Sequence, residues 1–156
     1  MIKYMKALFV FLMLSTSWAY AKDPTLDDYH AMAVSLAKCS GYWKAMIPPM
    51  KKTNDPASVK KLQGTVRNWE LASRMMFSAA HDPEGNKPYS AWEEMAGEYI
   101  ESGRIHMAFL LEETRSEEDR QAADKVMSEC ADIRDVQVAL IATYRKGVHT
   151  DKATTE

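Results

Sequence analysis

The chain contains four stretches with helical hydrophobic periodicity, each bounded by helix-breaking residues, and this pattern limits its fold more than any other feature. Apolar residues recur along each stretch at spacings of three and four, which indicates an amphipathic α-helix that buries one face. Short connections between such helices favour antiparallel neighbours. The sequence therefore predicts an all-α fold, an antiparallel up-down-up-down four-helix bundle.

The first helix is expected over residues 26–47. Thr25 is a suitable N-cap, and Asp28 stands at the third helical position, where it would complete a capping box. We expect Pro48 and Pro49 to end this helix, since proline disrupts a helix interior. The predicted core face carries Met32, Leu36, Cys39, Trp43 and Met46.

The next two helices also have recognisable beginnings. Asp55 is the expected N-cap of the second helix, and Pro56 occupies its first position. The third helix is expected to begin near Ser90, where Glu93 would complete a second capping box. Its segment Ile105–Leu111 is apolar on most sides, which predicts deep burial.

The fourth helix is expected between Ser116 and Gly147, because glycine commonly follows the last residue of a helix. Cys39 in the first helix and Cys130 in the fourth lie on apolar faces. In an antiparallel bundle they would lie about 20 and 24 Å from the same end, at a rise of about 1.5 Å per residue. We therefore predict an intramolecular disulfide between these helices; two free thiols or an intermolecular bridge are the alternatives.

Residues 1–21 have the three parts of a cleavable signal peptide. Lys3 and Lys6 form the basic part, residues 7–14 are apolar, and Ala19-Tyr20-Ala21 is a suitable cleavage site. Export would place the two cysteines in an oxidising compartment, where they are expected to pair. We expect a periplasmic or secreted protein, with an uncleaved signal anchor as the alternative.

Cleavage would leave a chain of single-domain length. We expect a bundle domain over residues 22–147 and a flexible C-terminal tail over 148–156. The signal holds two of the 20 basic residues and none of the 22 acidic ones, so the rest is mildly acidic. That charge argues against nucleic acid as a partner. No later apolar run reaches the length of about 20 residues that spans a bilayer, so no membrane span is expected after cleavage.

The histidines are the candidate ligands for a metal or haem. No Cys-x-x-Cys-His run for covalent haem is present, and no paired Cys or His for structural zinc. In the predicted bundle His30, His81 and His149 would gather near one end, while His106 lies on a core face. Imidazoles suit copper, nickel and zinc. We predict no bound cofactor; a haem- or metal-binding carrier is the alternative.

No pattern indicates catalysis. A disulfide-bonded cysteine is not a nucleophile, and no Gly-x-Ser-x-Gly run occurs. We therefore expect that the protein is not an enzyme.

The connection between the first two helices carries a candidate interaction patch, which consists of Met46, Ile47, Met50, Lys51 and Lys52. Methionine side chains adapt to varied partner surfaces. The alternative is that Ile47 and Met50 cap the core while the lysines are merely solvated. The expected function is that of a small soluble exported binding or interaction protein with a protein partner: an inhibitor, an immunity-type protein or an adaptor.

Overall fold

A computed structural model describes residues 23–53, 55–112 and 115–153, with side chains described as far as residue 147. These residues are mostly helical and contain no β-strand, which confirms the predicted all-α class. The elements are α2 (Leu26–Ala45), α3 (Ile47–Lys52), α4 (Pro56–His81), the 3₁₀ helix η1 (Tyr89–Trp92), α5 (Glu93–Leu110), α6 (Glu117–Asp132) and α7 (Arg134–Ala153). The predicted signal peptide lies outside the described residues.

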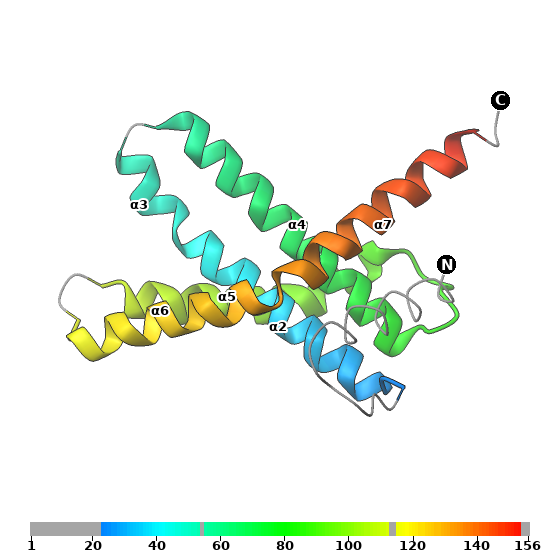
Figure 1. The fold of residues 1–156 in the computed structure, drawn as a ribbon, viewed down its shortest axis with the longest axis horizontal. Coiled ribbons are helices and arrows are strands. Elements are labelled where there is room, and N and C mark those ends of the chain that lie inside the picture. The colour runs from blue at the N-terminus through cyan, green and yellow to red at the C-terminus, as the bar shows by residue number, and fades with distance from the viewer. Residues whose placement is uncertain (1–22, 54, 113–114, 154–156) are drawn as a thin grey trace.

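Helix α2 is the centre of the fold and packs most extensively on α4 and α5 (Figure 1). Helix α4 runs back along α2, α6 runs back along α5, and α7 turns away from α6 to contact α4. The larger buried cluster joins α2, α4, α5 and α7. A smaller cluster joins α6 to the ends of α2 and α5 through Ala45, Met107, Leu110 and Ala123.

Three of the predicted helix beginnings are confirmed. The backbone N–H of Asp28 donates to Thr25 Oγ1 over 3.2 Å, and the backbone N–H of Thr25 donates to Asp28 Oδ2 over 2.7 Å. Asp55 Oδ1 accepts from the backbone N–H of Ser58 over 3.2 Å. Ser116 caps α6 in a box of the same kind. Local side-chain chemistry therefore decides where α2, α4 and α6 begin.

The cap of α4 leads to a prediction about pH. Hydrogen bonds from Ser58 lower the pKa of Asp55. A carboxyl group whose pKa is lower in the folded than in the unfolded state stabilises the fold at pH values above its unfolded-state pKa. This stabilisation is lost as the pH falls through the folded-state pKa, because the carboxyl group then becomes protonated in both states. We expect Asp55→Ala to lower the free energy of unfolding at pH 7, and the difference from the wild type to shrink below about pH 4.

Urea unfolding of both proteins at pH 7 and at pH 3 measures this difference. Asp124→Ala, an exposed change inside α6, is the control for the loss of one carboxylate. An Asp55→Ala effect of the same size at both pH values would contradict the assignment.

The two prolines begin a helix and do not end one, so this prediction is wrong. Helix α2 ends at Ala45, and Met46 is both its C-cap and the N-cap of α3. Pro48 and Pro49 lie in the first turn of α3, where a backbone N–H would have no helical partner. The connection is consequently a short helix.

The predicted capping box at Ser90 and Glu93 is also wrong. Residues Tyr89–Trp92 form a 3₁₀ turn, and α5 begins at Glu93 with no side-chain hydrogen bond at its N-cap, Trp92. The turn buries the Trp92 ring, which stacks on His81 at a centroid distance of 5.6 Å. Burial of a large aromatic ring thus overrides the local capping pattern.

The predicted fourth helix is divided at Ile133, although no proline or glycine stands there. Helix α6 contacts α2, to which Cys130 is bonded, and α5, whereas α7 contacts α4. The chain bends because its two halves pack on different neighbours. The predicted end at Gly147 is wrong as well, since α7 continues to Ala153.

The segment Ile105–Leu111 is only partly buried, contrary to prediction. Met107 and Leu110 are buried, but Ile105 is 56% exposed and Phe109 is 48% exposed. Packing covers one side of this part of α5 and leaves the opposite side uncovered by the described residues. The Arg115 guanidinium stacks on the Phe109 ring, at 3.5 Å from the ring centroid.

The predicted disulfide between Cys39 and Cys130 is confirmed. It joins α2 to α6, with 5.7 Å between the Cα atoms and a sequence separation of 91. It therefore connects the central helix to a helix that otherwise makes few contacts with it.

Helices α2 and α5 approach most closely where glycines face backbone. A β-carbon on Gly103 would overlap the carbonyl oxygen of Lys38 and lie 2.9 Å from its Cα atom. A β-carbon on Gly41 would overlap the carbonyl oxygen of Ile100 and lie 2.6 Å from the nitrogen of Arg104. The absence of side chains at these two positions lets the helices meet backbone to backbone.

Candidate functional site

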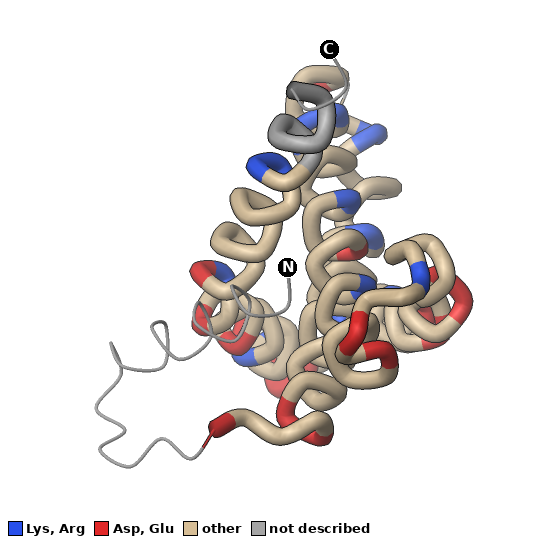
Figure 2. Tube along the Cα trace, turned by 90° about the vertical axis from the view of Figure 1, so that its right-hand side faces the viewer, with Lys and Arg blue, Asp and Glu red and all other residues tan. Residues whose placement is uncertain are grey.

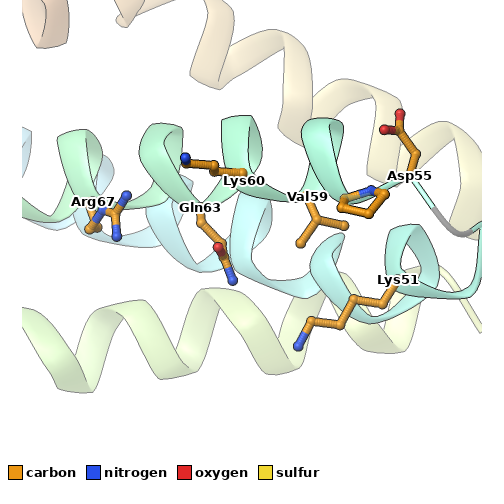
Figure 3. Close-up of a pocket in the computed structure, with 7 residues that line it drawn as sticks. Lys51, Asp55, Val59, Lys60, Gln63 and Arg67 are labelled. Atoms are coloured by element: carbon orange, nitrogen blue, oxygen red, sulfur yellow. The ribbon is translucent and has the colours of Figure 1, made fainter.

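A groove of about 520 Å³ lies beside α3 and the first half of α4 (Figure 3). In Figure 3, Lys51 of α3 lies on the same side of α4 as the Val59 and Gln63 side chains, while Asp55 points away. The residues that line the groove are Lys51, Asp55, Pro56, Val59, Lys60, Gln63 and Arg67. Asp55 is the N-cap of α4, and helical spacing places the five lining residues from Pro56 to Arg67 along one side of that helix.

Cations dominate this groove. Lys51, Lys60 and Arg67 are exposed, and none of them has an ion-pair partner among the described residues. The one acid in the lining, Asp55, is engaged as the N-cap of α4, and its lowered pKa favours the ionised form. Lysines and arginines gather towards the upper end of the molecule in Figure 2. The groove is therefore suited to a negatively charged group.

The predicted interaction patch forms α3 and its N-cap. Lys51 and Lys52 are exposed, while Met46, Ile47 and Met50 are half-buried. No residue of α3 is fully buried. The patch thus places accessible apolar surface next to the cationic groove, and Lys51 belongs to both.

Gln63 and Arg67 line the groove although no motif in the sequence singles them out. Their spacing is the one indication of their position. From Pro56 to Lys60, on to Gln63 and then to Arg67, the intervals are four, three and four residues, which places all four on one helix face. The spacing alone does not show that α3 folds back beside this face.

Two of the candidate metal ligands meet. His30 Nδ1 of α2 lies 2.9 Å from His81 Nε2 at the end of α4, and the ring planes are 89° apart. His30 packs edge-on against Phe77 and Tyr99, and His81 stacks on Trp92. This cluster lies where α2 begins and α4 ends, far along α4 from the groove.

The other two histidines do not join this pair. His106 is exposed on α5, edge-on to Tyr42, so its predicted position on a core face is wrong. The side chain of His149 lies outside the described residues, and α7 leads away from the end where α2 begins (Figure 1). Among described residues, no group of three or more His, Cys, Asp or Glu could hold a metal ion.

A larger cavity of about 970 Å³ lies between α4, the loop after it and α7. Two of its charged side chains, Asp82 and Arg74, are engaged with other residues. The Asp82 carboxylate accepts from the backbone N–H of Lys87 over 2.6 Å, and Arg74 pairs with Glu93 at 3.4 Å. Burial raises the pKa of Tyr89, which keeps this phenol protonated at neutral pH. The two other charged residues of the lining are Glu84, which accepts from the Asn86 side chain, and Lys87, which lies over the Trp92 ring, so acids and bases alternate here and no cationic surface like that of the α3–α4 groove is formed.

Comparison of the chain with family models, curated proteins and solved structures found no match. In the described part of the chain, none of the helices combines the length and the apolar character that a bilayer span requires.

Proposed function

We propose that this protein is an exported binding protein that holds an acidic segment of a partner protein in the α3–α4 groove. The observation that carries the proposal is the set of exposed cations, Lys51, Lys60 and Arg67, without ion-pair partners among the described residues. Complementary charge raises the rate of association and selects against cationic partners.

The neighbouring apolar surface supplies the second half of such an interface. Met46, Ile47 and Met50 are half-buried, so a partner would remove their remaining surface from water. Methionine accommodates partners of different shape. An inhibitor, an immunity-type protein or an adaptor would each use a surface of this composition.

Export is supported by the Cys39–Cys130 disulfide, which is typical of an oxidising compartment. Together with the predicted signal peptide, it points to the periplasm or the extracellular space as the place where the partner is met. The partner search accordingly uses a periplasmic extract.

Charge reversal in the groove tests the proposal. We expect Lys51→Glu with Arg67→Glu to abolish capture of an acidic protein that the wild type retains from periplasmic extract, because the pocket would then repel it. Capture by the wild type is expected to weaken as salt rises, since both charged surfaces are exposed. Immobilised protein, a salt series and mass spectrometry of the eluates measure both effects.

A matched control changes the net charge equally at other sites. Lys125 of α6 and Arg145 of α7 are exposed and lie outside the groove, so Lys125→Glu with Arg145→Glu should leave capture intact. Met50→Ser is expected to weaken capture without changing its salt dependence. Equal loss of capture in both charge-reversed proteins would rule out the groove as the binding site.

A further inference from the structure

We propose that the cavity of about 970 Å³ between α4, the loop after it and α7 binds a small uncharged aromatic molecule that carries a hydrogen-bond acceptor. Sites for small molecules have volumes of about 300–1,000 Å³, mostly apolar walls and a few polar groups. The cavity shares no lining residue with the proposed partner groove, because it lies beside the second half of α4. The two sites can therefore be tested separately.

Helix α4 supplies apolar surface to the cavity. Leu71, Met75 and Ala79 line it at intervals of four residues, which places them on one face of the helix. Leu71 is half-buried, and the other two are buried. The Met75 side chain is flexible and can adapt to the shape of a bound molecule. Such a surface favours a ligand with an apolar body, since both surfaces leave water on binding.

Two tyrosines from different elements add aromatic surface. Tyr89 of η1 and Tyr144 of α7 line the cavity, with ring centroids 6.0 Å apart and planes tilted by 57°. Tyr144 follows Leu140 and Ile141, through which α7 joins the core, and it remains 36% exposed. An aromatic ligand can pack edge-on or offset against these rings. The lining therefore favours an aromatic ligand over an aliphatic one.

One buried polar group in the lining has no hydrogen-bond partner among the described residues. Ser78 lines the cavity and is 5% exposed, and its hydroxyl makes no such bond. In contrast, the hydroxyl of the buried Ser73 donates to the carbonyl oxygen of Ala33 over 3.0 Å. A buried hydroxyl without a partner is unfavourable. The carbonyl oxygen of a ligand could accept the Ser78 proton and satisfy this group.

The charges of the lining favour an uncharged ligand. Two acids and two bases line the cavity, namely Asp82, Glu84, Arg74 and Lys87, so their charges balance. Each of them is engaged with a neighbour through a hydrogen bond, an ion pair or an aromatic ring. An ionised ligand would lose its hydration without gaining a free counter-charge.

Titration of the purified ¹⁵N-labelled protein with 2-acetonaphthone, an uncharged aromatic ketone, tests the site by NMR. We expect saturable shifts of the backbone amide signals of Ser78 and Tyr144, with a Kd below about 1 mM. Ser78→Ala should weaken binding about threefold to tenfold, because the ketone loses its donor. Tyr144→Ala should weaken it at least about threefold. The anion 2-naphthoate should bind in the cavity at least about tenfold more weakly than the ketone.

Ser73→Ala is the matched control, because this serine is bonded to Ala33 and lies outside the lining. It should lower the free energy of unfolding and keep the wild-type affinity for the ketone. Ser78→Ala should unfold like the wild type, since it loses no hydrogen bond to the described residues. Urea unfolding separates these outcomes. Unchanged ketone affinity in Ser78→Ala or Tyr144→Ala, or no saturable shift of the wild-type signals up to about 1 mM ketone, would overturn the proposal.

Discussion

Replacement of Cys39 and Cys130 by alanine is expected to lower the free energy of unfolding by about 4–5 kcal/mol. The disulfide closes a loop between residues 91 apart, so it removes many conformations from the unfolded chain. Native packing changes less, because alanine keeps the β-carbon at two buried positions. Urea unfolding of the wild type and the double variant measures the difference.

The location of the bond adds a structural consequence. Helix α6 makes few contacts with α2 apart from this bond. Loss of the disulfide should therefore lower the local stability of α6 and α7 more than that of α2 and α4. Hydrogen exchange would show this as lost protection in residues 117–147 of the double variant. The wild type treated with a strong reductant should show the same pattern. A difference in unfolding free energy below about 1 kcal/mol would contradict the expectation.

Gly103→Ala and Gly41→Ala are each expected to lower the free energy of unfolding by about 3 kcal/mol, the upper end of the range for overpacked cores. The added methyl would collide with backbone atoms of the facing helix, namely those of Lys38 or of Ile100 and Arg104. Backbone cannot rotate away as a side chain can, so α2 and α5 must separate. Thermal or urea unfolding measures the loss.

Gly97→Ala and Gly64→Ala are the matched controls. No atom lies within 4 Å of a β-carbon built at either position. Alanine is favoured over glycine in a helix by up to about 1 kcal/mol, so both controls should be neutral or stabilising. If Gly103→Ala behaved like Gly97→Ala, the close approach of α2 and α5 would be refuted.

The candidate site was partly predictable. Lys51 and the neighbouring methionines were evident from their position between two helices, and His30 and His81, which are in contact, were two of the three histidines expected near one end of the predicted bundle. The sequence did not indicate that Arg67 and Gln63 line a groove, because a helix face becomes one wall of a groove only when another element lies beside it. The position of α3 depends on how Met46 and the prolines after it turn the chain.

The sequence by itself determined the helical class, three helix beginnings and the disulfide partners. A cap is decided by a side chain and the backbone within one turn, and a chain with two cysteines has only one possible intramolecular disulfide. Only the tertiary structure decided the bend at Ile133, the exposure of Phe109 and the close approach at Gly103. Each of these depends on which surface packs against which, and an apolar face fits several neighbours until the whole core is assembled.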